Sequence, residues 1–193
     1  MRVIGGEARG RRLKAPSGRQ LRPTADRVRE ALFNILAPEL AAADFLDLYA
    51  GTGAVGIEAL SRGARSATFV EREPAHVAVI HANLEACGLE DRARVVEDGV
   101  GRALGSLASR DARFHLVFLD PPYDAGLERR RSLRKLGQGP LLAPGARIVL
   151  ETPSRQVPPA EPGLVLGRVA RYGEASLAFY GAISRSLGSP EPA

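Results

Sequence analysis

The tetrapeptide Asp120-Pro121-Pro122-Tyr123 carries the groups in this chain that are best suited to chemistry. It follows the apolar run Phe114–Leu119, which is typical of a buried parallel strand. Ligands of open α/β sheets bind at the carboxyl ends of such strands. A carboxylate, a backbone carbonyl and an aromatic ring in one turn favour a planar substrate whose exocyclic amine donates hydrogen bonds while its ring stacks on Tyr123. The alternative is a turn that proline merely stiffens, because X-Pro bonds impose extended geometry.

A glycine-rich turn joins an earlier predicted strand to its helix. Its glycines, Gly51, Gly53 and Gly56, allow tight turning and the close approach of a ligand, with Thr52 between the first two. Asp47 lies inside the strand, four residues before Gly51, where it could reach a charged ligand. The glycine spacing alone is a weak signal, because nicotinamide-dependent enzymes share it.

Acidic residues end the next two predicted strands. Glu71 follows the glycine turn by about twenty residues, which suits ribose hydroxyls, and Asp98 could accept the adenine amine, with Glu97 as its competitor. A dinucleotide-binding fold explains the glycines and Glu71 equally well. It explains neither the tetrapeptide at Asp120 nor the many arginines among the first 30 residues, which are described below. S-adenosylmethionine explains all of them. We therefore predict this cofactor, bound by Asp47, Gly51, Thr52, Gly53, Gly56, Glu71 and Asp98.

Strand and helix patterns alternate along the chain. Strands are predicted at residues 45–50, 67–70, 94–96, 114–119 and 147–150, and helices at 55–61, 74–88, 100–109 and 127–137, with a turn at Pro144-Gly145. The last two strands, at 164–171 and 176–183, are predicted to form a hairpin. Such alternation predicts an α/β fold with a doubly wound, mostly parallel sheet. The closing antiparallel hairpin is similar to the sheet of class I methyltransferases.

The N-terminal part differs from this pattern. Residues 2–22 are predicted to be an irregular extended segment or a hairpin, and Pro23-Thr24 to open a helix that Pro38 limits. The apolar stripe of that helix consists of Val28, Ala31, Leu32, Ile35 and Leu36. We expect a small basic extension and helix for RNA contact (residues 1–37), a Rossmann-like domain (38–183) and a disordered tail (184–193).

Positive charge is concentrated at the N-terminal end. The first 30 residues hold nine basic and three acidic side chains, a net charge of +6, whereas the whole chain carries +5, so the remaining residues sum to −1. A localised basic patch is typical of a polyanion-binding site, although a solvated arm is the alternative. RNA contacts are predicted for Arg9, Arg11, Arg12, Arg22, Thr24 and Arg27.

Two further predictions concern basic residues. Arg22 and Thr24 could instead approach the cofactor or the substrate base, because they begin a helix whose N-terminus favours anions. The second basic stretch is either another RNA-binding patch or a solvated helix face, and it contains Arg129, Arg130, Arg131, Arg134 and Lys135.

Composition narrows the class of protein. The 193 residues suit one compact domain, and no apolar stretch is long enough to span a membrane. A single cysteine, Cys87, excludes an internal disulfide framework, and the three histidines show no metal-binding spacing. We expect a cytoplasmic protein that needs no metal or membrane, and a monomer.

At this point the chain resembles the RsmD-type small-subunit rRNA guanine-N2 methyltransferases of bacteria, over residues 3–182. The resemblance rests on four segments: Gly5-Gly6 with Arg9-Gly10-Arg11-Arg12-Leu13, the helix that starts at Arg22-Pro23-Thr24 and continues through residues 27–36, the loop at 47–53 with 56–64, and Asp120-Pro121-Pro122-Tyr123. Thr52 stands where serine is common in the family.

The resemblance implies methyl transfer from S-adenosylmethionine to N2 of one guanine in 16S rRNA, read in the assembled small subunit. We expect Asp120 and the Pro121 carbonyl to accept hydrogen bonds from the amine, with Pro122 completing the motif and Tyr123 stacking on the base. Three alternatives stay open: an amino-methyltransferase acting on DNA adenine or protein glutamine, an RNA-binding assembly factor without activity, and a nicotinamide dehydrogenase.

Overall fold

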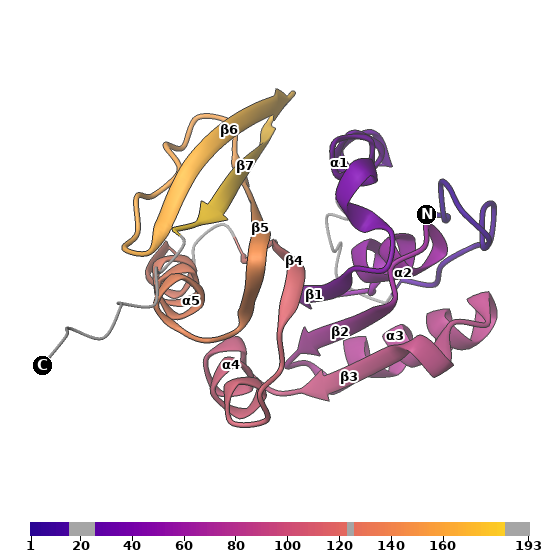
Figure 1. Ribbon diagram of the computed structural model, residues 1–193. Helices are drawn as coiled ribbons and strands as arrows, with labels where there is room; N and C mark the ends of the chain where they lie inside the picture. The colour runs from indigo at the N-terminus through magenta and orange to yellow at the C-terminus, as the bar shows by residue number, and fades with distance from the viewer. Residues whose placement is uncertain (16–25, 123–125, 184–193) are drawn as a thin grey trace, which may run out of the picture.

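A seven-stranded sheet organises the protein (Figure 1). The computed structural model describes residues 1–15, 26–122 and 126–183. The strand order is β3-β2-β1-β4-β5-β7-β6. The strands are β1 (Asp44–Leu48), β2 (Ser66–Glu71), β3 (Ala93–Glu97), β4 (Phe114–Leu119), β5 (Leu142–Pro153), β6 (Leu164–Tyr172) and β7 (Ala175–Ala182).

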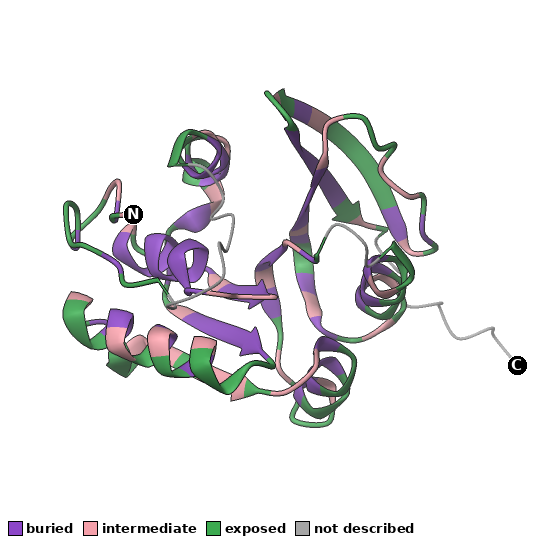
Figure 2. Cartoon of the chain, turned by 180° about the vertical axis from the view of Figure 1, so that it is seen from behind, coloured by how far each residue is buried: buried purple, intermediate pink, exposed green. Residues whose placement is uncertain are grey.

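The pairing of the strands confirms the predicted fold class. Strands β1 to β5 pair in parallel, whereas β7 runs antiparallel to both β5 and β6. The central strands read as continuous apolar runs because helices cover both faces of the sheet. The edge strand β6 is mostly exposed, as Figure 2 shows. The doubly wound, mostly parallel sheet therefore ends in the expected antiparallel hairpin.

Helices cover both faces of this sheet. They are α1 (Asp26–Leu40), α2 (Ala54–Ser61), α3 (Pro74–Cys87), α4 (Val100–Ala108) and α5 (Gly126–Gln138), with a short 3₁₀ turn at Glu90–Arg92. Side chains alternate across each strand, so Phe45 packs in the cluster formed with α1, α2 and α3, and the next residue, Leu46, packs in the cluster formed with α4 and α5. This alternation decides which face each strand-end residue lies on.

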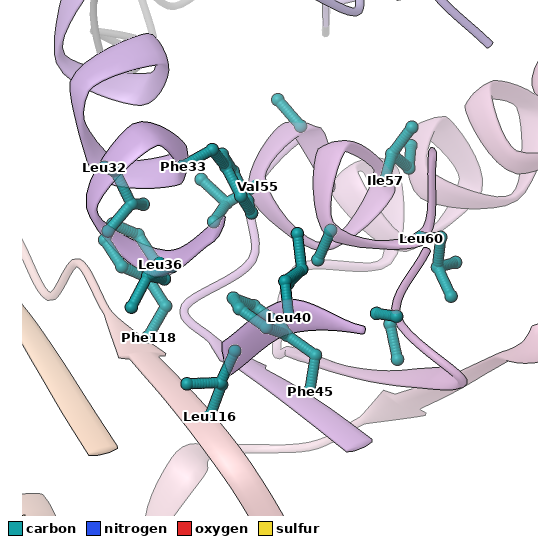
Figure 3. Packing of buried hydrophobic residues seen from close by; sticks show 14 of the residues in the cluster. Leu32, Phe33, Leu36, Leu40, Phe45, Val55, Ile57, Leu60, Leu116 and Phe118 are labelled. Carbon is teal, nitrogen blue, oxygen red and sulfur yellow. The ribbon is translucent and has the colours of Figure 1, made fainter. Parts of the chain in front are cut away.

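Helix α1 corrects two predictions. It continues through Pro38 to Leu40, because a proline this close to the end removes only one hydrogen bond and Leu40 is buried beyond it. Figure 3 shows α1 packed over α2 and the sheet through Leu32, Phe33, Leu36 and Leu40. The buried stripe includes Phe33 and Leu40, whereas the predicted members Ala31 and Ile35 are only half-buried.

Strand β5 is longer than predicted and includes the expected turn at Pro144-Gly145. Phe114 pairs with Leu142 but Leu116 pairs with Arg147, so the intervening residues of β5 bulge out of the ladder. Gly145 has a φ of 74°, which glycine adopts readily. Pro144 and Gly145, which were predicted to form a turn between elements, instead form a bulge, and the strand continues beyond them.

The N-terminal arm packs on α2 and is part of the same core. Its apolar residues Val3, Ala8 and Leu13 are buried with those of α1 and α2. Glu58, which is fully buried in α2, accepts hydrogen bonds from the Ile4 and Gly5 N–H groups, at 2.8 Å each. A backbone bridge between Arg2 and Arg12 closes the arm into a hairpin-like loop, consistent with the prediction.

The expected division at residues 37/38 falls inside α1, and the predicted tail at 184–193 lies outside the described residues. Within the described part of the chain, no helix combines the length and the apolar character needed to cross a membrane.

Candidate functional site

Four acidic side chains meet at the carboxyl ends of the parallel strands. Asp47 lies in β1, Glu71 ends β2, Asp120 follows β4, and Glu151 lies in β5. Leu48 pairs with Leu119, and Leu119 pairs with Leu150, so the next residues along β4 and β5 are Asp120 and Glu151, side by side. The predicted cofactor residues and Asp120 therefore meet at the carboxyl ends of the parallel strands.

Asp47 is almost completely buried beneath the glycine loop. Its Oδ2 accepts a hydrogen bond of 2.9 Å from the Gly56 N–H, at the start of α2. Burial raises the pKa of Asp47 to about 8, and the nearby Glu71 carboxylate adds to this increase, although the Gly56 hydrogen bond opposes it. No described Arg, Lys or His side chain lies within salt-bridge distance of Asp47. With a pKa of about 8 this carboxyl group is mostly protonated near neutral pH in the ligand-free protein, and a positively charged ligand bound beside it would favour its ionised form.

The glycine loop needs its glycines for two different reasons. Gly53 precedes α2 with a φ of 75°, in the left-handed region that other residues rarely adopt. Gly56 is required for space, because a Cβ atom there would lie 2.3 Å from Cε1 of Phe69 in β2. Thr52 is buried, and its carbonyl accepts a hydrogen bond of 3.0 Å from Asn83 Nδ2. The loop is therefore held tightly against α3 and β2.

Glu71 and Asp98 lie next to each other across β2 and β3, where the sequence placed the ribose and adenine contacts. Glu71 Oε2 accepts the Gly51 N–H at 2.8 Å, and its Oε1 accepts the Arg72 N–H at 2.8 Å. The Asp98 N–H donates to the Glu71 carbonyl at 3.0 Å. The Arg102 guanidinium, with its Nε 2.7 Å from Asp98 Oδ1, lowers the pKa of Asp98. Asp98 therefore stays ionised as an acceptor.

Asp120 is half-buried at the end of β4. Desolvation raises its pKa well above the ordinary value, and Glu151 and Asp47 raise it further, whereas Arg129 lowers it. Pro121 is buried and Pro122 is exposed, but Tyr123 lies outside the described residues. A strongly perturbed carboxyl group at a ligand-binding edge is typical of a functional site.

Comparison with known proteins agrees with this geometry. A family model described as "Conserved hypothetical protein 95" matches residues 1–181. The chain belongs to this family. It is the RsmD-type methyltransferase family, so the resemblance found in the motifs is confirmed.

Relatives of the RsmD-type family match most of the chain. The "Putative rRNA methyltransferase YlbH" of Bacillus subtilis is 37% identical over 181 residues, which cover 93% of this chain and 98% of that protein. The "Ribosomal RNA small subunit methyltransferase D" of Escherichia coli K12 is 43% identical over 152 residues, which cover 79% of this chain and 74% of the relative.

Solved structures of similar proteins share the whole fold. "Putative methyltransferase yhhF" from Escherichia coli has a TM-score of 0.81 at 37% identity, and the match covers 96% of this chain and 99% of the other. A hypothetical protein of Thermus thermophilus has a TM-score of 0.79 at 35% identity, covering 93% and 98%. Family and fold both support S-adenosylmethionine as the cofactor.

The basic arm of this RsmD-type chain is exposed where the sequence predicted RNA contacts. Arg9, Arg11 and Arg12 are exposed, as is Arg27 on α1. None of these four forms a salt bridge with another described residue. Arg22 and Thr24 lie outside the described residues. The exposed arginines are therefore available to a polyanion.

The second basic stretch is not a free patch. Arg129 is buried, and Arg130 and Arg134 both pair with the buried carboxylate of Glu161, at 2.8 and 3.2 Å. Lys135 Nζ donates to the Gly101 carbonyl at 2.7 Å. These contacts fasten α5 to the segment before β6 and to α4. The solvated-face interpretation fits the exposed side chains of Arg130, Arg131, Arg134 and Lys135, although three of them also make these contacts, and it is wrong for the buried Arg129.

Glu151 and Asn83 were missed in the sequence, and Arg129 was predicted only as part of the second basic stretch. Glu151 follows an apolar run in the same way as Asp120, and this signal could have found it, but the strand was predicted to end one residue earlier. Asn83 and Arg129 lie within helical patterns that gave no sign of their burial. Among the described residues, no group of three or more His, Cys, Asp or Glu side chains could hold a metal ion.

Proposed function

We propose that this protein transfers a methyl group from S-adenosylmethionine to the exocyclic N2 of a guanine in 16S rRNA of the assembled small subunit. One observation carries the proposal: Asp120 and the Pro121 carbonyl follow β4 directly beside the glycine loop, in a chain of the RsmD-type family. Asp120 and the Pro121 carbonyl, the proposed acceptors for the amine, then lie beside the glycine loop at the carboxyl ends of the strands.

The residues at this edge fit S-adenosylmethionine. The buried Asp47, with its raised pKa, and the neighbouring Glu71 would hold a ligand that carries positive charge, and Gly51 and Gly53 leave room for its close approach. Glu71 and Asp98 are placed for the ribose hydroxyls and the adenine amine. When bound, this cofactor supplies an electrophilic methyl group on a positively charged sulfur.

Asp120 and the Pro121 carbonyl would orient the amine. The lone pair of the guanine N2 is delocalised into the ring, which makes the amine a poor nucleophile. Two acceptors that bind its N–H groups draw the nitrogen towards a tetrahedral shape and fix the direction of its lone pair. Positive charge then develops on the nitrogen, so both acceptors stabilise the transition state more than the ground state. Tyr123 is the proposed stacking platform for the base.

The arm would bind the RNA around the target. Arg9, Arg11 and Arg12 project from a loop that is anchored to α2 through Glu58, so a phosphate held by them stays at a fixed position relative to the glycine loop. Such positioning supports a folded RNA or ribonucleoprotein substrate, which holds the guanine at a matching distance.

The test uses methyl-labelled S-adenosylmethionine with small subunits that lack the modification. The wild-type protein is compared with Asp120→Ala and with Asp91→Ala, an exposed aspartate away from the site. Nucleosides are then identified by mass spectrometry. We expect label in N2-methylguanosine with wild type and Asp91→Ala, and its loss with Asp120→Ala. Label in another nucleoside or in ribosomal protein would contradict the assignment, and cofactor binding without any transfer would favour an assembly factor.

A further inference from the structure

Tyr49 occupies a strained position between β1 and the glycine loop. Strand β1 ends at Leu48, and the first glycine of the loop is Gly51. The backbone of Tyr49 has a φ of 63°, in the left-handed region that side chains of this size rarely adopt. Such a conformation costs free energy and persists only where the surrounding contacts impose it. A bulky residue in this conformation therefore points to a side chain that is needed where it lies.

The side chain of Tyr49 reaches helix α5. Its hydroxyl lies 2.9 Å from Oγ of Ser132, and either group can donate the hydrogen bond between them. Tyr49 is half-buried and packs against the apolar cluster that contains Leu133 and Leu136 of α5, and Ser132 itself is buried. Burial raises the pKa of Tyr49 to about 12, so its hydroxyl stays protonated near neutral pH. A neutral, partly buried hydrogen bond therefore joins two segments that are 83 residues apart.

The two segments joined in this way carry the two parts of the proposed reaction. Tyr49 leads into the glycine loop, whereas Ser132 lies in α5. The tetrapeptide that begins at Asp120 lies between the end of β4 at Leu119 and the start of α5 at Gly126. The position of α5 therefore fixes one end of the segment that carries the amine acceptors, and β4 fixes the other.

Other contacts hold the glycine loop and α5 separately. The Gly51 N–H donates to Glu71 of β2, and Arg130 of α5 pairs with Glu161, which precedes β6. These contacts keep the loop and the helix in place, but they do not join one to the other. Tyr49 does so, and loss of its hydroxyl should leave both parts folded while relaxing their relative position.

We propose that Tyr49 is a positioning residue, whose hydroxyl ties the glycine loop to α5 and so keeps the cofactor loop aligned with the acceptors Asp120 and Pro121. This inference rests on the proposed function, because it concerns the alignment of the same two reactants. Group transfer is sensitive to alignment, and a displacement of about 1 Å can cost on the order of 100-fold in rate. Tyr49 therefore acts on the rate of transfer rather than on the binding of either reactant.

The test compares Tyr49→Phe, which removes only the hydroxyl oxygen, with Tyr180→Phe. Tyr180 is the matched control, because its hydroxyl also donates a hydrogen bond, of 3.0 Å, to the Pro159 carbonyl. With small subunits and labelled S-adenosylmethionine, we expect Tyr49→Phe to lower kcat by about tenfold and to leave the dissociation constants of cofactor and subunit within about twofold. Tyr180→Phe should leave all three unchanged. An unchanged kcat in Tyr49→Phe, or a loss of cofactor affinity that accounts for the slower reaction, would overturn the proposal.

Ser132→Ala removes the partner hydroxyl and decides the matter if Tyr49→Phe does not fold. It should lower kcat to the same extent as Tyr49→Phe. The double variant should be no slower than either single variant, because all three lose the same hydrogen bond. Losses that multiply in the double variant would show that the two hydroxyls act separately, and this result would also overturn the proposal.

Hydrogen exchange separates this inference from the proposed function, because it needs no methyl acceptor. The exchange of the α5 amides is followed by mass spectrometry with and without S-adenosylhomocysteine. In wild type and Tyr180→Phe, we expect the ligand to slow this exchange by about fivefold, the factor that one net hydrogen bond contributes, and Tyr49→Phe should lose the effect. Equal slowing in Tyr49→Phe, or none in wild type, would overturn the tether. If exchange responds as expected but wild type does not methylate guanine, only the proposed function fails.

Discussion

The side-chain amide of Asn83 forms two hydrogen bonds with the backbone of Lys14, one to its N–H and one to its carbonyl, as the backbone of a paired β-strand does. Its Oδ1 accepts the Lys14 N–H at 2.7 Å, and its Nδ2 donates to the Lys14 carbonyl at 3.1 Å and to the Thr52 carbonyl at 3.0 Å. Asn83 is fully buried in α3. One side chain therefore joins the basic arm to the glycine loop.

Replacing this asparagine tests the connection. Asn83→Leu has a similar volume but leaves three backbone groups without their partner, so we expect a loss of about 1–3 kcal/mol in the free energy of unfolding. Affinity for S-adenosylmethionine should also fall, because the Thr52 carbonyl loses its anchor. Chemical denaturation and calorimetric titration measure the two effects. Glu85→Gln, an exposed change of one atom on the same helix, should alter neither. Unchanged affinity in Asn83→Leu would show that the loop holds its shape without the arm.

Asp47 should make the stability of the cofactor-free protein depend on pH. Its pKa in the folded protein is raised to about 8, from the model-peptide value of 3.8, so the native state binds more protons than the unfolded state between these values. The free energy of unfolding of wild type should therefore fall as pH rises through this window. Asp47→Asn lacks this loss, and relative to wild type it should gain on the order of a few kcal/mol between pH 4 and pH 8. Asn Oδ1 can still accept the Gly56 N–H.

Thermal and denaturant unfolding across the pH range, with Asp91→Asn as the exposed control, measures this difference. Stability curves that run parallel for wild type and Asp47→Asn would contradict the raised pKa. Asp47→Asn should nevertheless bind S-adenosylmethionine more weakly, because the positively charged ligand loses a carboxylate.

Gly56→Ala tests how closely α2 approaches β2. The new Cβ would lie 2.3 Å from the Phe69 ring, so the helix or the ring must shift. We expect a loss of about 1–3 kcal/mol in the free energy of unfolding, together with weaker cofactor binding. Gly105→Ala is the matched control, because this exposed glycine of α4 has open space around it. There the substitution should stabilise the protein by about 0.5–1 kcal/mol. A neutral Gly56→Ala would mean that Phe69 moves aside at little cost.

Removing charge from the arm should weaken RNA binding in a salt-dependent manner. We expect the triple variant of Arg9, Arg11 and Arg12 to glutamine to lose affinity for small-subunit RNA. The slope of log affinity against log salt should decrease by about 0.7–0.9 for each phosphate that the variant no longer neutralises. The control carries the same change in net charge at Arg94, Arg110 and Arg113, which are exposed and outside the arm. Filter binding at several salt concentrations measures both, and an equal loss in the two variants would indicate a general charge effect rather than a site on the arm.

The sequence by itself determined most of the secondary-structure elements and most of the candidate residues for cofactor binding and methyl transfer. Continuous apolar runs and helical stripes predicted the strands and helices to within a few residues, because both patterns are local. The glycine loop and the tetrapeptide at Asp120 were recognisable because each consists of residues that lie close together in the sequence, directly after a predicted strand. Local turn signals failed at Pro38 and Pro144-Gly145, where burial of Leu40 and a bulge opposite β4 outweighed them.

Only the tertiary structure decided which groups meet. Glu151 joins Asp120 through the register of β4 and β5, and Asn83 reaches Lys14 across a separation of 69 residues. Arg129 was grouped with the exposed arginines of its helix, because composition cannot distinguish a buried guanidinium from a solvated one. Burial and the charge of neighbours depend on contacts between distant segments, and these contacts set the pKa of Asp47 and Asp120.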